Sequence, residues 1–257
     1  MKKIILTVSA CCLSACGGGG GEVQTSYSVV RAFSDSSGVG RGVGKSGDEE
    51  AVIYFITPEV VSTVQTANAN NSDVGPDIDP QNFPLISQRA GYDFRQGYFE
   101  GTPVTVVAKT GQVDNADNIV FYFDVNGTNL IMAGVDALKG TPSGEVKYVG
   151  LYSVEDSRYE NWLQVGDLNL TANFDTKAFT IDANSDITRL SGSGYLDVSS
   201  GQISSITLSL NDSYENETRD ASLLGNIGGS GGATVAAIWH TNEDTPIYKG
   251  AIIGDKQ

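Results

Sequence analysis

Residues 167–174 read Asp-Leu-Asn-Leu-Thr-Ala-Asn-Phe, and this stretch decides the fold class. Leu168, Leu170, Ala172 and Phe174 occupy every second position, and polar residues fill the positions between them. Successive side chains of a β-strand point to opposite faces, so one face of this segment is apolar and the other is polar. The stretch therefore predicts an antiparallel strand with one face in a core and the other in solvent.

The same alternation recurs through the C-terminal half of the chain. Ile206, Leu208 and Leu210 alternate with Thr207 and Ser209, which predicts a second strand of this kind. We expect eight strands in this half, at 146–154, 166–174, 177–184, 192–198, 203–211, 221–228, 234–241 and 248–254. Short connections rich in turn residues join them, with no helical periodicity between. This pattern predicts an up-and-down sheet that closes into an eight-stranded barrel, because closure removes both exposed edges.

Two connections in this half are longer and more polar than the others, at 155–164 and 211–220. Long loops on a rigid scaffold are where binding side chains gather. Tyr159 and Trp162 lie in the first loop, and Tyr214 lies in the second. We predict that these three aromatic residues anchor a partner; the alternative is that they only pack within the protein.

The first half of the chain predicts a second antiparallel sheet. Strands are expected at 27–33, 51–57, 103–109, 119–125 and 129–133, with Asn126-Gly127 as the hairpin turn between the last two. Residues 60–66 fit a strand or a short helix, and residues 67–90 predict a long surface loop. The composition changes at 139–144, which we take as a domain boundary. The chain is thus predicted to be all-β, with a sheet domain over 22–139 and a barrel domain over 140–257.

A series of short motifs runs in order through residues 146–257. They are Val146-Lys147-Tyr148-Val149-Gly150, Gly166-Asp167-Leu168, Ala172-Asn173-Phe174-Asp175, the glycine-rich 225–232 before the strand 234–239, and Gly250-Ala251-Ile252-Ile253-Gly254. This ordered set resembles the C-terminal barrel of the transferrin-binding protein B-like surface lipoproteins, a group that includes factor H-binding protein and haem-binding relatives. The chain departs from the family pattern at 173–174, where Asp-Phe is frequent, and at 224–226, where Phe-Tyr-Gly is usual. The resemblance implies a handle-like sheet domain beside a barrel. It transfers no ligand, because the partner-binding loops of the family vary and none matches here.

The N-terminus predicts export and a lipid anchor. Lys2 and Lys3 precede an apolar stretch that is too short to span a bilayer, so residues 1–15 indicate a cleaved signal peptide. The sequence Leu13-Ser14-Ala15-Cys16 resembles the bacterial lipobox, in which the cysteine becomes the acylated first residue of the mature protein. Five glycines follow Cys16, which makes 16–21 a flexible tether. Residue 17 is not aspartate, which favours the outer membrane; whether the protein faces the periplasm or the cell surface stays open. The alternative is an ordinary secreted protein with a chance cysteine.

Composition excludes several kinds of chemistry. Cys11 and Cys12 leave with the signal peptide and Cys16 is lipidated, so the mature chain has no thiol for a disulfide, a nucleophile or a metal site. The formal net charge of −15 at pH 7 repels nucleic acid and anionic lipid, which makes both poor partners. An acidic surface also serves solubility alone, so a basic partner is one interpretation of the charge and not the only one.

Short matches to known motifs do not fit their structural context. Gly44-Lys45-Ser46 lacks the preceding glycine of a phosphate-binding loop, and the Gly-x-Ser-x-Gly at 228–232 leads into a predicted strand where a nucleophile elbow needs a helix. His240 is the only histidine, whereas zinc sites usually need three or four His or Cys ligands. We therefore expect no metal; His240 is most simply a structural residue, with an axial haem ligand as the alternative. Oxygen ligands for calcium could come from Asp73, Asp77 and Asp79 or from Asp114 and Asp117, although neither set follows the calcium-loop pattern.

The sequence as a whole predicts a monomeric, non-enzymatic lipoprotein of the outer membrane that needs no cofactor. We expect it to bind a macromolecular partner through its loops: a host or environmental protein, iron carriers included. The alternative is a lipoprotein that binds haem or a small ligand in the handle or in the barrel interior.

Overall fold

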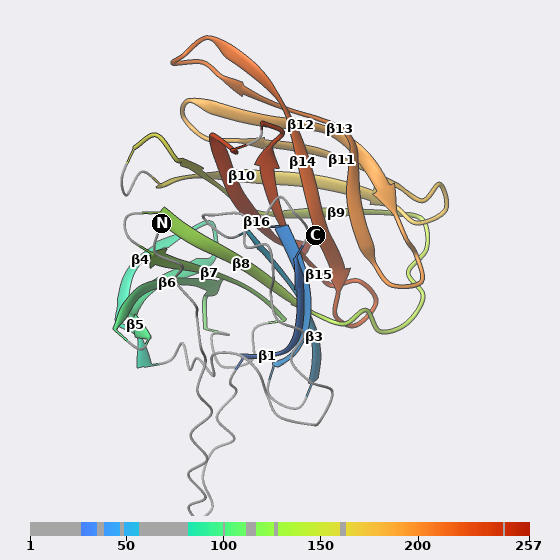
Figure 1. Ribbon diagram of the computed structural model, residues 1–257. Helices are drawn as coiled ribbons and strands as arrows, with labels where there is room; N and C mark the ends of the chain where they lie inside the picture. The colour runs from blue at the N-terminus through green and yellow to red at the C-terminus, as the bar shows by residue number, and fades with distance from the viewer. Residues whose placement is uncertain are drawn as a thin grey trace, which may run out of the picture.

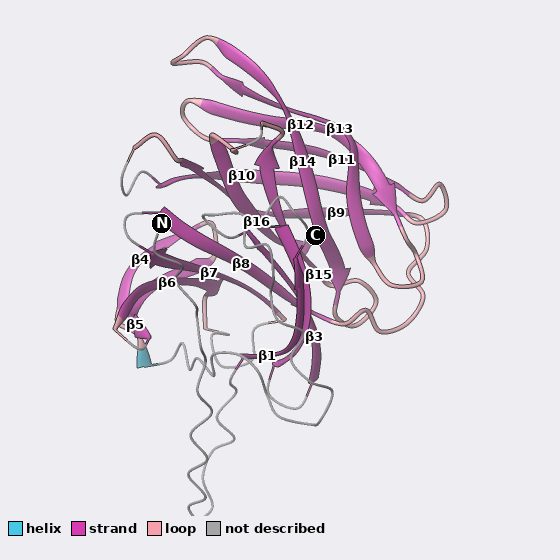
Figure 2. Ribbon diagram, in the orientation of Figure 1, coloured by secondary structure: helices cyan, strands magenta, loops and turns pink. Residues whose placement is uncertain are grey.

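The computed structural model describes residues 27–34, 39–46, 49–56, 82–99, 101–111, 117–125, 128–159, 163–243 and 245–257. Within these ranges the regular structure is almost entirely β-strand (Figure 2), as the alternation in the sequence predicted. Among the same residues, no helix has both the length and the apolar character needed to cross a membrane.

The first eight strands form an open antiparallel sheet, which we call the handle. They are β1 (Tyr27–Ser34), β2 (Val39–Ser46), β3 (Glu49–Ile56), β4 (Leu85–Arg89), β5 (Tyr92–Phe99), β6 (Thr102–Lys109), β7 (Asn118–Val125) and β8 (Thr128–Asp136). Their spatial order is β1-β2-β3-β8-β7-β6-β5-β4, so two meanders join where β3 pairs with β8. The residues 126–127 of the predicted hairpin turn lie outside the described ranges, but Val125 pairs with Thr128 on either side of them.

The remaining eight strands close into a barrel, as predicted. They are β9 (Glu145–Asp156), β10 (Leu163–Asn173), β11 (Ala178–Asn184), β12 (Thr188–Leu196), β13 (Gln202–Asp212), β14 (Glu217–Gly228), β15 (Thr234–Thr241) and β16 (Tyr248–Lys256). Each strand pairs with its neighbour in sequence, and β16 pairs back to β9. In Figure 1 the barrel lies above the handle, and the barrel strands β14, β15 and β16 lie against the handle strands β3, β7 and β8.

The barrel interior is filled by side chains. Leu168, Leu170 and Ala172 of the stretch quoted first all point inward and are at most 1% exposed. Trp239 stacks on Tyr152 with ring centroids 5.6 Å apart, and its indole Nε1 donates to the backbone oxygen of Ser153 at 3.1 Å. Eight strands enclose just enough space for such side chains. This packing argues against a ligand carried in the barrel interior.

One face of the handle packs on the outer wall of the barrel and shares a core with it. Three buried tyrosines of the handle donate their hydroxyl protons to barrel side chains across this interface. Tyr54 donates to Asn226 at 3.2 Å, Tyr92 to Asp255 at 2.8 Å and Tyr122 to Ser153 at 2.6 Å. Burial raises the pKa of all three hydroxyls, that of Tyr54 to about 12, so each remains a hydrogen-bond donor.

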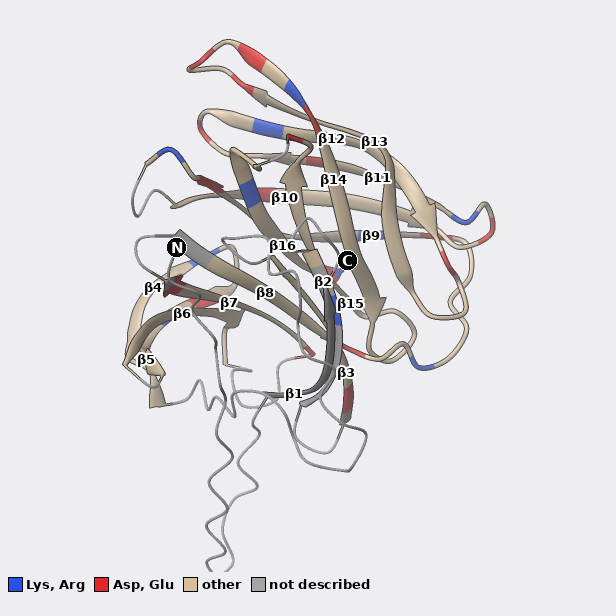
Figure 3. Ribbon diagram, in the orientation of Figure 1, with Lys and Arg blue, Asp and Glu red and all other residues tan. Residues whose placement is uncertain are grey.

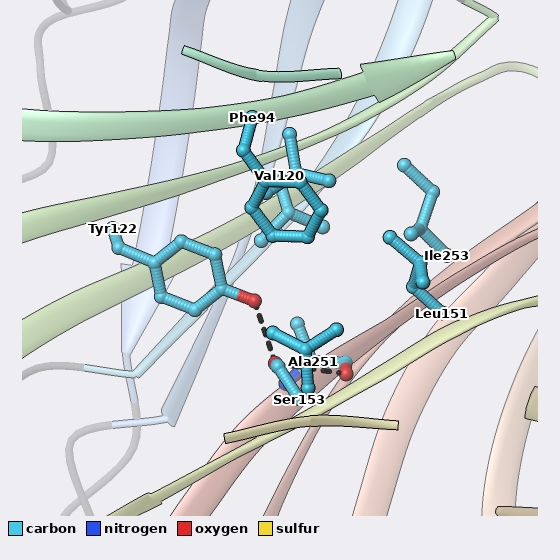
Figure 4. Close-up of a pocket in the computed structure, with 9 residues that line it drawn as sticks. Phe94, Val120, Tyr122, Leu151, Ser153, Ala251 and Ile253 are labelled. Carbon is cyan, nitrogen blue, oxygen red and sulfur yellow. Dashed lines mark hydrogen bonds between the residues drawn. The ribbon is translucent and has the colours of Figure 1, made fainter. Parts of the chain in front are cut away.

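Figure 4 shows a small pocket in this interface, beside the hydrogen bond from Tyr122 to Ser153. Its walls are apolar except for these two residues. The lining comes from handle and barrel alike: Phe94, Val107, Val120, Tyr122, Leu151, Ser153, Val165, Ala251 and Ile253. Ser153 Oγ also accepts from the amide of Ala251 at 2.9 Å and donates to its carbonyl at 3.1 Å, so its hydrogen-bonding capacity is used within the protein.

Three handle strands differ from the sequence expectation. No strand is predicted over Tyr92–Phe99, where β5 lies, because Arg95, Gln96 and Gly97 interrupt its apolar residues. Residues 67–90 were expected to form a loop, but β4 occupies 85–89 at the edge of the sheet, with all five residues exposed. The turn to β5 places Ala90 and Gly91 at φ 49° and 85°, and alanine is an unusual residue for the first of these positions. β2 was not expected at all, because the glycines at alternate positions of 39–44 suggest a loop. Residues 60–66 lie outside the described ranges.

Ile206 corrects the expectation for the strand 203–211. Leu208 and Leu210 are buried in the barrel as predicted, but Ile206 is 72% exposed. Gly194 pairs with Ser205 and Ser193 with Thr207, so Ile206 is the extra residue of a β-bulge. A bulge changes which face the residues before it point to, and sequence alternation does not reveal it.

The barrel should fold without the handle, because it has a closed hydrogen-bond ladder and a core of its own. A polypeptide of residues 140–257 should give a β-type circular dichroism spectrum and a cooperative thermal transition. Its midpoint should lie below that of residues 22–257, since Leu151, Ile238 and Ile253 lose the cover of the handle. A disordered spectrum would show that the two parts share one indispensable core.

Candidate functional site: the loop end of the barrel

Four connections of the barrel meet at one end, which we call the loop end: β9–β10, β11–β12, β13–β14 and β15–β16. They gather at the upper left of Figure 1, because connections in an up-and-down barrel alternate between its two ends. Two of them carry the predicted anchors, Tyr159 in β9–β10 and Tyr214 in β13–β14. The fold therefore places two side chains that are 55 positions apart in the sequence at the same end of the barrel.

Both predicted loops are shorter than the sequence suggested. β13 continues to Asp212 and β14 begins at Glu217, so only 213–216 form a turn where 211–220 was expected to be a loop. The polar residues of this segment pair across the hairpin: the side-chain amide nitrogen Nδ2 of Asn211 donates to Thr218 Oγ1 at 3.1 Å. In the other connection, β9 continues to Asp156 and β10 begins at Leu163.

The turns that carry the two tyrosines are held by hydrogen bonds. Asp212 Oδ1 accepts from the backbone amides of Tyr214 at 2.7 Å and Glu215 at 3.0 Å. The amide of Tyr159 donates to the carbonyl of Asp156 at 3.1 Å. The rings nevertheless stand in solvent, with Tyr159 52% and Tyr214 77% exposed. The third predicted anchor, Trp162, lies outside the described residues.

Arg158 lies beside Tyr159 in the β9–β10 connection and hydrogen-bonds to residues at the loop end of the barrel. Its Nε and Nη2 atoms donate to Asp156 Oδ1 at 2.9 Å and Oδ2 at 2.7 Å, and Nη2 also reaches the hydroxyl of Tyr248 at 2.5 Å. The guanidinium carbon lies 5.1 Å from the ring centroid of Tyr248, a cation–π distance. The hydrogen bonds to Asp156 raise the pKa of Arg158. No sequence pattern points to this arginine, because its partners Asp156, Tyr248 and Glu217 come from three different strands.

Arg219 forms a second charged cluster next to the first. Its Nε and Nη2 atoms bind both oxygens of Glu217 at 2.9 and 2.6 Å, and Nη1 binds Glu243 Oε1 at 2.6 Å. The hydrogen bonds from Arg219 hold the pKa of Glu217 below its ordinary value. Burial alone would raise the pKa of Glu243, but hydrogen bonds from Thr241 and Arg219 outweigh it and the pKa is lowered. Figure 3 shows acidic segments at the tips of these loops.

Tyr248 lies between the two clusters, fully buried in the barrel mouth. Its hydroxyl oxygen is 2.7 Å from Asp212 Oδ2 and 3.0 Å from Glu217 Oε1, so its proton is offered to either carboxylate. Burial, and then the hydrogen bonds to these carboxylates, raise the pKa of Tyr248. The hydroxyl thus remains protonated and joins strands β13, β14 and β16.

Acid should weaken the loop end through its carboxylates. The folded-state pKa of Glu217 lies below its ordinary value of 4.5, so its contribution to stability is present above that pH and is lost as the pH falls through the lower folded value. We expect the thermal midpoint of Glu217→Gln to be lower than wild type at pH 7, with a shallower decline between pH 4.5 and 3. The control is Asp175→Asn, at the other end of the barrel. Identical acid profiles for wild type and Glu217→Gln would contradict the assignment.

The structure gives no support to the catalytic motifs. Gly228 ends β14 and Thr234 begins β15, so the Gly-x-Ser-x-Gly residues form a hairpin connection, and Gly44–Ser46 are the last residues of β2. His240 lies on the outward face with Ala236 and Ile238, and its Nδ1 is 2.9 Å from the carbonyl of Thr241. Among the described residues, no three His, Cys, Asp or Glu side chains are placed to hold a metal ion. Asp73, Asp77, Asp79 and Asp114 lie outside those residues.

Comparison of the sequence with protein-family models finds no match, and comparison with curated proteins finds none either. Solved structures are similar at low sequence identity. Isotype 1 transferrin-binding protein B of serogroup B Neisseria meningitidis is 9% identical with a TM-score of 0.53, over 88% of this chain and 51% of that one. A double mutant of transferrin-binding protein B from Haemophilus parasuis Hp5 is 14% identical with a TM-score of 0.49, over 85% of this chain and 53% of that one.

A crystal structure described as a surface lipoprotein is 11% identical with a TM-score of 0.44, over 92% of this chain and all of that one. The fold likeness rests on the Neisseria structure, and this chain spans about half of its length. An open handle sheet packed on a closed eight-stranded barrel is the arrangement that the sequence motifs implied. The chain therefore has a fold similar to that of about half of transferrin-binding protein B.

Proposed function

We propose that this chain is a lipid-anchored protein of a bacterial outer membrane, exposed at the cell surface, which binds a protein partner through the loop end of its barrel and catalyses no reaction. The observation that carries the proposal is the pair Tyr159 and Tyr214. Two large, amphipathic side chains stand exposed on hydrogen-bonded turns at the same end of a rigid barrel. Tyrosine on a rigid backbone supplies contact area at little conformational cost, which suits a protein interface.

The fold likeness supports the class of function. The similar Neisseria protein is by its name a binding protein for transferrin, which is itself a protein. We carry over only the kind of ligand, a protein, with iron carriers among the candidates. The filled barrel interior favours binding at the surface over carriage of a small molecule.

Membrane attachment is proposed from the sequence. Cys16 follows a lipobox-like Leu13-Ser14-Ala15, and the glycines after it would let the folded part reach a large partner. The domain assignment is likewise a proposal: a signal peptide over 1–15, a tether over 16–21, the handle over 22–139 and the barrel over 140–257.

Affinity capture tests the proposal. Residues 22–257, produced without the lipid anchor, are immobilised and exposed to host fluid or natural growth medium, and any retained protein is purified and tested again as a single component. We expect a saturable one-to-one complex. In a parallel titration with haemin we expect no Soret shift. A sharp Soret band that disappears in His240→Ala would instead assign the protein to haem binding.

A further inference from the structure

The two anchor turns of the loop end are joined through the barrel by one side chain. Tyr248 is 0% exposed and Asp212 is 3% exposed, so their 2.7 Å contact is shielded from water. On one side, the other oxygen of Asp212 holds the amides of Tyr214 and Glu215. On the other side, the Tyr248 hydroxyl receives the Nη2 proton of Arg158.

Arg158 extends this connection to the first anchor. Its guanidinium carbon lies 5.9 Å from the ring centroid of Tyr159, and its Nε–Nη2 edge is held by the carboxylate of Asp156, which is 2% exposed. The connection from ring to ring thus runs through Tyr159, Arg158, Tyr248, Asp212 and the amide of Tyr214. Every hydrogen bond along it involves a charged partner, and such bonds are shorter and stronger than neutral ones.

We infer that Tyr248 is a positioning residue, which fixes the placement of Tyr159 relative to Tyr214 before any partner arrives. Without it, a remaining link between the two sides among the described residues is the 3.9 Å ion pair of Arg158 Nη2 with Glu217 Oε1, which is longer than either hydrogen bond through Tyr248. An interface whose anchors are already in place loses less conformational freedom on binding. The consequence for affinity rests on the proposed function; the coupling of the two turns does not.

Tyr248→Phe tests the coupling because it removes the hydroxyl and keeps the ring. The matched control is Tyr148→Phe: Tyr148 is also 0% exposed, and its hydroxyl donates to the carbonyl of Gly232 at 2.8 Å, at the opposite end of the barrel. 3-Fluorotyrosine is placed at 159 or at 214 in residues 22–257, and its fluorine resonance is recorded. In Tyr248→Phe we expect both resonances to shift or broaden, and in Tyr148→Phe neither. Unchanged resonances in a folded Tyr248→Phe protein would overturn the inference.

A second pair of variants keeps the test decisive if Tyr248→Phe does not fold. Arg158→Lys changes the residue of the β9–β10 connection, together with its 3.9 Å ion pair to Glu217, and Asp212→Asn changes the residue that holds the β13–β14 turn. Coupling requires each to move the resonance of the opposite turn: Tyr214 in Arg158→Lys, and Tyr159 in Asp212→Asn. If each variant moves only the resonance of its own turn, the turns are independent and the inference is wrong.

The effect of Tyr248 on binding is measured as the dissociation rate of the partner protein purified by affinity capture. Tyr248→Phe should raise the dissociation rate about tenfold, the size of one hydrogen bond to a charged group, while Tyr148→Phe leaves it unchanged. A merely structural role would lower thermal stability in both variants and would not separate their dissociation rates. If the fluorine resonances shift in Tyr248→Phe but its dissociation rate equals that of Tyr148→Phe, the two turns are coupled and the coupling does not serve binding. In that case the proposed function fails at this site, whereas the coupling stands.

Discussion

Changing Cys16 to serine is expected to abolish the lipid anchor. A thioether-linked diacylglycerol needs the cysteine sulfur, and serine cannot supply it. Each buried methylene of an acyl chain contributes about 0.8 kcal/mol, so one chain holds a protein marginally and several hold it stably. The expected product is an unprocessed or soluble protein that no longer enters the detergent phase, measured by phase partitioning and by intact mass.

The matched control is Cys12→Ser, which changes a cysteine four positions earlier in the same leader. It should leave lipidation and partitioning unchanged. Mass spectrometry of the wild-type protein should place the mature N-terminus at Cys16. Any other N-terminal residue would contradict the anchor, although it would not affect the binding proposal.

Changing Tyr159 and Tyr214 together to alanine is expected to weaken partner binding by about 10²–10⁴-fold. Aromatic anchors at the centre of an interface typically contribute about 2 kcal/mol or more each, and a factor of ten corresponds to about 1.4 kcal/mol. Because the two side chains are 52% and 77% exposed, their removal should change the stability of the free protein by no more than about 0.5 kcal/mol. The thermal midpoint is measured alongside to show this.

Strand alternation made most of the fold predictable. In the barrel, segments such as 167–174 place every second residue in the core, and all eight predicted strands overlap observed ones. Closure of the sheet could be inferred from the number of strands and their short connections. The handle was predicted less completely. β2 alternates with glycine, β4 is an exposed edge strand with no buried face, and β5 has its apolar residues interrupted by polar ones.

The local geometry of the loop end was only partly predictable. The position of Tyr159 and Tyr214 in polar connections predicts exposed side chains, and both are exposed at the same end of the barrel. The lengths of the loops were overestimated, because polar residues such as Asn211 and Thr218 pair across a hairpin and hydropathy cannot distinguish this from a loop.

The network beneath the anchors gave no sequence signal. Arg158, Asp212 and Tyr248 meet only after β16 has closed onto β9 and the strand registers are set. A one-residue change of register would turn these side chains to the other face of the sheet. The bulge at Ile206 has the same origin, since it follows from the pairing of two strands and not from either sequence alone.

The most direct test that a protein binds at the loop end is equilibrium binding of the purified partner. It is measured side by side for residues 22–257 and for the double variant Tyr159→Ala, Tyr214→Ala. Tyr195→Ala is the control, because Tyr195 is 49% exposed on β12, in the barrel wall. We predict an affinity lower by two orders of magnitude or more for the double variant and an unchanged affinity for Tyr195→Ala. Wild-type affinity in a folded double variant, or an equal loss in Tyr195→Ala, would contradict the placement of the binding site at the loop end.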